Sequence, residues 1–369
     1  MTPKRSDIIV LCIAILLFNI ILINNCPYHV DYIQYAKSID NFYSNRIIDD
    51  NVNGKYIYVF IMGILVMPFH MQGINTFMAM IVITGLFQAI LIWLFYRLTN
   101  SILKTYLMAT TLTFLMFISQ PETVMLSSIF MLLFFINRDK PYSEFFIMFA
   151  SLIRIDFAVY YLFTRKKTAV LPMLFTFLLW LTGRYFLHSD FGINRHIFTA
   201  MLVFLLSYGA YFILFLGDAR PREKNFDWII HLAIVMFFMF FLKFPSQKIF
   251  FFPVMLSFII YDFKNTDRFK WIIIAFAMIN VIMASIMLYQ RESLCTAEAL
   301  YEYGLKHNES IYFGVLQPYL DYYGLKEEPP FKYKITKLCD DSVDYVIVED
   351  WRNGQLFFLS YKFCLEPFE

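Results

Sequence analysis

Long apolar segments separated by short polar ones make up most of this chain. Several segments approach the roughly 17–25 residues that a helix needs to cross the hydrocarbon core of a bilayer, and the shorter ones would cross with tilt or local thinning. Backbone groups in lipid must bond to one another, so each segment is predicted to be a helix. The segments cover residues 8–23, 56–71, 74–96, 104–119, 122–136, 143–163, 169–187, 196–216, 228–243, 247–262 and 271–288.

The first segment follows a basic pair, Lys4-Arg5, as the apolar part of a signal peptide does. No small-x-small cleavage site comes after it, and Asn24-Asn25-Cys26-Pro27 is typical of the end of a retained span. We therefore expect this segment to be an anchor helix.

Clusters of Lys and Arg between the segments predict how the chain is oriented. Basic loops of membrane proteins are retained in the cytoplasm. When the predicted spans are counted backward from residue 264, the strongest basic clusters fall on the same side of the membrane. We therefore expect that side to be cytoplasmic. These clusters are Lys4-Arg5, residues 165–167, residues 220–224 and residues 264–270.

The basic residues at 97–104 and 138–140 fall on the same side only under two conditions. Segment 56–71 must not cross fully, and segment 143–163 must enter and leave on the cytoplasmic side. If both segments crossed fully instead, only 97–140 would be inverted and the later topology would not change.

The second condition is supported by Arg154 and Asp156, which interrupt the middle of segment 143–163. Charged residues at the bilayer centre are costly and usually functional. A bend between two half-helices would bring both charges toward the outer face. The predicted outer face then holds residues 24–73, the turn at 119–122, the bend at 154–156, the loops 188–195 and 243–248, and the tail after residue 288.

The tail is acidic and has shorter apolar runs, which predict strands at Ser310–Val315, Asp344–Val348 and Gln355–Tyr361 and a helix at Gln317–Gly324. The predicted architecture is an all-α polytopic membrane domain of about nine to eleven hydrophobic helices, followed by a small extracytoplasmic α/β lobe. The membrane domain covers residues 1–290 and the lobe covers residues 291–369.

Composition supports a membrane protein and excludes several function classes. Apolar residues make up 59% of the chain and charged residues 16%, against roughly 45–50% and about 25% in soluble domains. No Gly-rich phosphate loop indicates nucleotide binding, and no basic tail indicates nucleic acid. The five cysteines do not have the spacing of metal ligands. A divalent cation is the one cofactor that the sequence leaves open.

Asp31 lies directly after the first span and is the first candidate for chemistry. A carboxylate at the membrane surface suits a general base that takes a proton from an acceptor hydroxyl. The plain alternative is a solvated or helix-capping Asp. Asp40, Asp49 and Asp50 follow in the same loop.

Three motifs together resemble the GT-C superfamily of membrane glycosyltransferases, which use polyprenyl-phosphate sugars and include mannosyltransferases. They are Asp31-Tyr32-x-x-Tyr35-Ala36 after the first span, Gln120-Pro121-Glu122 before a short apolar run, and Ser151-Leu152-Ile153-Arg154-Ile155-Asp156-Phe157. The resemblance extends over most of the membrane domain. The chain departs from many relatives in having Asp31-Tyr32 where they carry paired acids, and in being shorter.

The resemblance implies that Asp31 is the base of an inverting transfer in which the lipid phosphate leaves. Arginine or lysine would hold the charge that develops on the phosphate. Candidates for that role are Arg154, Arg195, Lys243 and Lys248.

Each of these candidates also has a structural interpretation. Lys243 and Lys248 could simply extend to the membrane interface, and Arg154 could form a structural ion pair with Asp156. Glu122 could orient an acceptor, bind a divalent cation or cap the helix that follows.

The sequence therefore predicts a glycosyltransferase of the cell envelope, integral to the plasma membrane, with its active site and lobe extracytoplasmic. It would transfer sugar from a polyprenyl-phosphate donor to a lipid, glycan or protein acceptor. A polysaccharide polymerase or ligase, a transporter and a scaffold subunit are the alternatives. Transporters usually contain internal repeats, and this sequence has none that is convincing.

Overall fold

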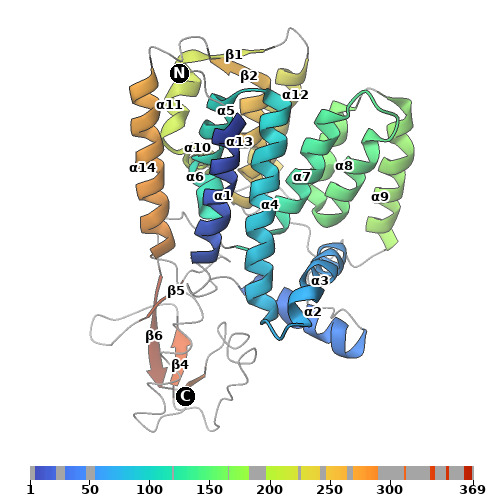
Figure 1. Ribbon diagram of the computed structural model, residues 1–369, viewed down its shortest axis with the longest axis vertical. Coiled ribbons are helices and arrows are strands. Elements are labelled where there is room, and N and C mark those ends of the chain that lie inside the picture. The colour runs from blue at the N-terminus through green and yellow to red at the C-terminus, as the bar shows by residue number, and fades with distance from the viewer. Residues whose placement is uncertain are drawn as a thin grey trace.

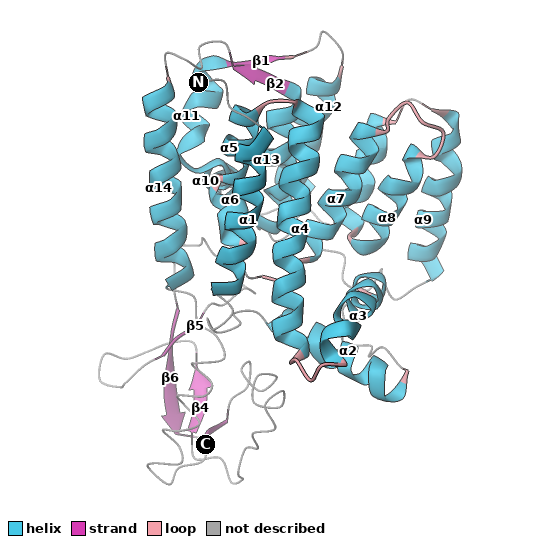
Figure 2. Ribbon diagram, viewed as in Figure 1, coloured by secondary structure: helices cyan, strands magenta, loops and turns pink. Residues whose placement is uncertain are grey.

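The computed structural model describes most of the apolar part of the chain and four short strands of its tail. The described residues are 5–21, 30–46, 55–118, 120–164, 166–182, 197–222, 226–241, 247–263, 269–289, 311–312, 333–336, 346–348 and 361–367. They form a mostly helical bundle with a small sheet below one end of it (Figures 1 and 2).

The helices follow the predicted apolar segments, except α2, which lies between the first two of them. The α-helices are α1 (Arg5–Ile21), α2 (Val30–Asn45), α3 (Tyr56–His70), α4 (Thr76–Thr99), α5 (Ile102–Ala109), α6 (Leu112–Met116), α7 (Thr123–Ile136), α8 (Ser143–Ile153), α9 (Val170–Thr182), α10 (Ile197–Tyr208), α11 (Phe212–Asp218), α12 (Asp227–Phe241), α13 (Gln247–Ile260) and α14 (Lys270–Tyr289). Among the described residues, the 3₁₀ helices η3 (Ile155–Phe163), η4 (Lys167–Ala169) and η6 (Gly209–Tyr211) connect some of them.

Within the described residues, two helical stretches are long and apolar enough to cross a membrane. One is α4, whose first turn is capped by Asn75 and which ends at Asn100 in the left-handed conformation. The other runs from Ile197 to Asp218 through α10, η6 and α11. The remaining apolar helices are shorter, and segment 104–119 is divided into α5 and α6.

The described residues of several cationic segments lie at one end of the bundle, which we call the basic end. The short strands β1 (Ala219–Pro221) and β2 (Tyr261–Phe263) pair there in antiparallel register and join α11 to α13 (Figure 1). Lys104 pairs with Asp262 of β2, and the Lys166 ammonium donates to the Lys140 carbonyl over 2.5 Å.

The reversal expected at Arg154 is confirmed. Arg154 has extended backbone angles between α8 and η3. The start and the end of the segment meet at the basic end, since Arg138 Nη2 donates to the Phe163 carbonyl over 2.7 Å and Lys166 Nζ to Ser143 Oγ over 3.2 Å. The bend at 154–156 therefore lies at the opposite end of the bundle.

Helices α2 and α3 lie at that opposite end, which we call the α2 end (Figure 1). They lie below α7 and α8 and beside the lower end of α4, and they do not run through the length of the bundle (Figure 1). Segment 56–71 thus forms a helix that stays at one end, as its predicted incomplete crossing requires.

The tail contributes a four-stranded sheet on the same side as α2 (Figure 2). Its strands are β3 (Ile311–Tyr312), β4 (Tyr333–Thr336), β5 (Val346–Val348) and β6 (Tyr361–Pro367), in the order β3-β4-β6-β5. Only the β3–β4 pair is parallel.

Three of the predicted tail elements can be compared with this sheet. Strands 310–315 and 344–348 are present in shorter form, while predicted strand 355–361 overlaps β6 only at Tyr361. Residues 361–366 alternate between apolar and polar side chains, which is the pattern of a sheet with one covered face. The predicted helix at 317–324 lies outside the described residues.

Candidate functional site

Four segments that are far apart in the sequence meet at the α2 end and form what we call the polar cluster. It consists of Tyr32 from α2, Glu122 before α7, Arg154 and Asp156 at the bend, and Lys248 from α13. All three sequence motifs contribute to it.

Glu122 is at the centre of the polar cluster. It occupies the N-cap position of α7, but its side chain makes no capping hydrogen bond. One carboxylate oxygen, Oε1, lies 2.7 Å from Lys248 Nζ and also accepts a hydrogen bond from the Tyr32 hydroxyl. The Glu122 side chain is 4% exposed, so Lys248 and Tyr32 supply the partners that a buried carboxylate needs.

Lys248 lies in the first turn of α13 and remains 23% exposed. Its ammonium is also 5.5 Å from the centre of the Tyr32 ring, a cation–π distance. The simple interpretation of an interfacial lysine extending to water does not account for these two inward contacts.

Arg154 and Asp156 form the second ion pair of the polar cluster. Arg154 Nε is 3.0 Å from Asp156 Oδ1, and Nη2 is 3.1 Å from Oδ2, so the guanidinium and the carboxylate meet in a forked geometry. Arg154 Nη1 also donates to Thr123 Oγ1 over 3.3 Å. Because Thr123 follows Glu122, the two ion pairs are adjacent.

Aromatic residues of α2 and α3 hold these helices against the turn at 120–122. The Tyr58 hydroxyl donates to the Pro121 carbonyl over 2.8 Å, and the Tyr35 and Tyr58 rings pack edge to face 5.4 Å apart. Tyr32 and Tyr35 are three residues apart on α2 and so share one face of it.

Asp31, the predicted base, lies in the first turn of α2 directly before Tyr32. Its side chain is outside the described part of the structure. Two of the predicted phosphate-binding candidates, Arg195 and Lys243, also lie outside the described residues. The other sequence candidates, Glu122, Arg154, Asp156 and Lys248, come together.

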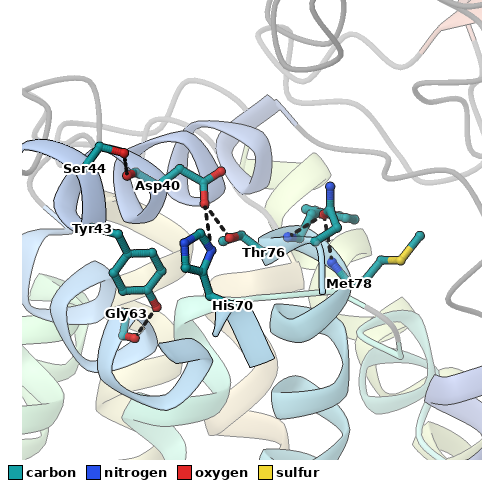
Figure 3. A network of polar contacts seen from close by, with 9 residues as sticks. Asp40, Tyr43, Ser44, Gly63, His70, Thr76 and Met78 are labelled. Carbon is teal, nitrogen blue, oxygen red and sulfur yellow. Dashed lines mark hydrogen bonds and ion pairs between the residues drawn. The ribbon is translucent and has the colours of Figure 1, made fainter. Parts of the chain in front are cut away.

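Asp40 is held in a different network (Figure 3). Its Oδ1 accepts a hydrogen bond from Thr76 and lies 4.0 Å from His70 Nδ1. The His70 ring packs against the Tyr43 ring at a tilt of 38°, and the Tyr43 hydroxyl donates to the Gly63 carbonyl over 2.5 Å. These contacts tie α2 to α3 and α4.

Partial burial shifts two ionisable groups of this Asp40 network. It raises the pKa of Asp40, against the opposing effects of Thr76 and His70. It also raises the pKa of Tyr43 to about 12, with a smaller contribution from the Asp40 charge. Tyr43 therefore remains a protonated donor at neutral pH.

Two buried glutamines are close in sequence to members of the polar cluster. Gln120 belongs to the second sequence motif, but the sequence assigned a role to neither side chain. Gln247 begins α13, and Gln120 precedes Glu122 by two residues. Both side chains are buried, and both have amide atoms without a hydrogen-bond partner among the described residues. A polar residue at the edge of an apolar segment was the only signal in the sequence, and it is a weak one.

Each of the two cations of the polar cluster is paired with a carboxylate, Lys248 with Glu122 and Arg154 with Asp156. Both cations lie near the N-termini of α7 and α13, where the helix dipole also favours negative charge. In the part of the chain that the structure describes, no three His, Cys, Asp or Glu side chains come together as metal ligands would.

Comparison with protein-family models, curated proteins and solved structures found no match for this chain.

Proposed function

We propose that this chain is an integral membrane glycosyltransferase. It moves a sugar from a polyprenyl-phosphate carrier to a lipid, glycan or protein acceptor on the extracytoplasmic face of the membrane. The observation that carries the proposal is the polar cluster itself. Three motifs that were singled out separately contribute side chains to one largely buried site, opposite the basic end.

The multi-pass placement is supported by the outer surface of the bundle. Large apolar side chains are exposed along α1, α9 and α14, as well as on the two helices that are long enough to span. Apolar surface of this extent is unfavourable in water and favourable against lipid. The basic end would face the cytoplasm, and the α2 end with the tail sheet would face outward.

The proposed reaction is a single inverting displacement. Asp31 takes the proton of the acceptor hydroxyl as the acceptor oxygen attacks the anomeric carbon. The bond between that carbon and the phosphate oxygen breaks, and the polyprenyl phosphate leaves with the electron pair. Lys248 and Arg154 stabilise the negative charge on the phosphate, and their effect is strong because the site is poorly hydrated.

A transporter is the second candidate, because two helical stretches are interrupted inside the bundle. The breaks are at Thr110, between α5 and α6, and at Gly209, within the Ile197–Asp218 stretch. Broken helices often surround transported ions or solutes. Here the side chain of Asn280 lies between the two breaks and bonds to both, which favours a structural closure over a binding site.

Transfer from radiolabelled polyprenyl-phosphate sugars to membrane and glycan fractions tests the function. We expect Asp31→Asn to abolish transfer and Asp40→Asn to retain it. Asp40 is a matched control because it is an acid on the same helix whose Thr76 and His70 contacts lie outside the polar cluster.

Each other result has a distinct meaning. Equal transfer by wild type and Asp31→Asn would support the glycosyltransferase activity but show that another acid of the first loop is the base. Absence of wild-type transfer over a broad panel of donors would overturn the glycosyltransferase in favour of the transporter or the scaffold. A polymerase or ligase would lengthen or join glycans without using the single-sugar donors.

A further inference from the structure

Two buried glutamines, each within two residues of one partner of the Glu122–Lys248 ion pair, have side-chain amide atoms without hydrogen-bond partners among the described residues. Gln247 is 0% exposed, and neither its Nε2 nor its Oε1 has a partner in the described part of the chain. Gln120 is 6% exposed, and its Oε1 is equally without a partner there. Buried amides are normally satisfied, so both side chains need an explanation.

Their positions place them beside the polar cluster. Gln247 and Lys248 are consecutive in the first turn of α13, and Lys248 reaches Glu122. At the other partner of the ion pair, the Gln120 backbone carbonyl accepts a hydrogen bond from the Glu122 backbone N–H over 2.7 Å. Each amide is thus within two residues of one partner of the ion pair.

An apolar side chain of similar size would cost less at either position. Burying an amide without a partner loses its hydrogen bonds to water and gains none. Such departures from well-satisfied packing occur mainly at functional sites, where a ligand supplies the missing partners. Both glutamines are therefore expected to bond to something that the polar cluster binds.

The chemistry of the unpartnered atoms indicates the class of ligand. Two of the three atoms are amide oxygens, which need hydrogen-bond donors, and the third is an amide nitrogen, which needs an acceptor. A phosphodiester has no proton to donate, so it cannot satisfy the oxygens. A hydroxyl donates and accepts, and neighbouring hydroxyls of a sugar match a side-chain amide.

We propose that Gln247 and Gln120 form a hydroxyl-binding subsite that orients the sugar of the donor beside the Glu122–Lys248 ion pair. Lys248 and Arg154 hold the phosphate, while the two amides distinguish a lipid that carries a sugar from one that does not. This assignment of the sugar to the donor rests on the function proposed above.

Binding to the full-length protein in lipid nanodiscs tests the subsite with two probes, a polyprenyl phosphate and the same lipid carrying a hexose. We expect wild type to bind the hexose-bearing lipid more tightly. Gln247→Met should weaken that binding roughly tenfold, the effect of one lost hydrogen-bonding group, and leave the sugar-free lipid unchanged. Lys248→Met should weaken both.

Gln88→Met is the matched control. Gln88 is also fully buried with an unpartnered Nε2, but its Oε1 accepts from Asn19 of α1, away from the polar cluster. Its replacement should leave both affinities unchanged. Gln247→Met removes an unsatisfied amide, so without ligand its melting temperature should be no lower than that of wild type. This measurement separates lost binding from misfolding.

Equal loss for both lipids in Gln247→Met, or no loss for either, would overturn the subsite. If wild type bound neither lipid, the proposed function would fail separately, and an alkyl glucoside would then decide about the subsite. Thermal stabilisation by that glucoside that disappears in Gln247→Met would retain a hydroxyl site without a phosphate donor. If the glucoside stabilised Gln247→Met as much as wild type, the hydroxyl-binding site would be ruled out.

Discussion

At the residue scale, the Glu122–Lys248 ion pair makes a prediction about stability. Removing one partner of a buried pair leaves the other charge uncompensated, at a cost of about 3–5 kcal/mol. Glu122 is the more buried partner, so Lys248→Met should destabilise the protein more than Glu122→Gln does. The double variant should cost much less than the sum of the two.

Unfolding of the two single variants and the double variant in detergent measures this coupling. Asp262→Asn is the control, because it weakens the ion pair of Lys104 with an exposed acid at the basic end. It measures how much stability is lost when one exposed charge is removed. Strict additivity of the Glu122 and Lys248 effects would contradict an energetically coupled pair.

Asp40 gives a pH-dependent prediction whose sign follows from its surroundings. Partial burial raises the pKa of Asp40 above its ordinary value, near 3.9. The folded protein therefore binds this proton more tightly than the unfolded chain, and the associated stability is lost as the pH rises through the raised pKa. We expect wild type to lose melting temperature relative to Asp40→Asn over that range, and parallel pH profiles would contradict this.

The sequence could single out most members of the polar cluster but not their partners. Arg154 and Asp156 stood out because charges within apolar segments are rare. Glu122 stood out as part of a motif, and Lys248 because it borders a predicted outer loop. The Arg154–Asp156 pair is local, and its proximity was expected. Tyr32 and Glu122 are 90 positions apart, and nothing in either local pattern encodes that contact. The glutamines were missed because only packing reveals that a polar group lacks a partner.

At the element scale, the interruption of the Ile197–Asp218 stretch depends on Gly209. Gly209 has a φ of +60°, which side chains other than glycine rarely adopt. The Asn280 Oδ1 atom accepts the next backbone N–H, of Ala210, over 2.9 Å, and Asn280 Nδ2 donates to the Thr110 carbonyl over 2.9 Å. One side chain of α14 thus satisfies backbone groups at two helix breaks.

Gly209→Ala should therefore destabilise the protein by more than about 2 kcal/mol. The new methyl group would be strained by the positive φ and would lie 2.9 Å from Asn280 Cγ. Gly217→Ala is the matched control, because its methyl group would meet no atom within 4 Å. In α11 that change should be neutral or stabilising by about 0.5–1 kcal/mol. Equal melting temperatures of the two variants would contradict this account of the break.

The same two breaks mark the limit of the sequence prediction for helices. Apolar content identifies where a helix is favoured, and most predicted segments contain one. It does not show where a helix is divided, because neither the break at Thr110 nor the one at Gly209 carries a charge or a proline. Thr111 caps α6 by accepting the Phe114 N–H, but a single threonine is common within uninterrupted helices.

At the scale of the whole molecule, charge predicted more than hydrophobicity did. The described residues of the cationic segments, among them Lys104, Lys166 and Arg220, lie at the basic end, and the bend at Arg154 lies opposite them. These features could be predicted because the positive-inside rule acts on short loops of the sequence. The order of the tail sheet could not, since β3, β4, β5 and β6 pair across long stretches of chain.

Two exposed positions decide between the predicted topology and its alternative. Met71, 76% exposed at the α2 end, should be extracellular, and Tyr142, exposed in the turn between α7 and α8, should be cytoplasmic. If segments 56–71 and 143–163 both crossed fully, these two positions would exchange sides.

We expect a membrane-impermeant maleimide to label Met71→Cys in intact cells and Tyr142→Cys only after permeabilisation. Labelling of the wild type measures the background from its own cysteines. Labelling of Tyr142→Cys in intact cells, with Met71→Cys protected, would establish the fully crossing topology and move the polar cluster away from the extracellular face.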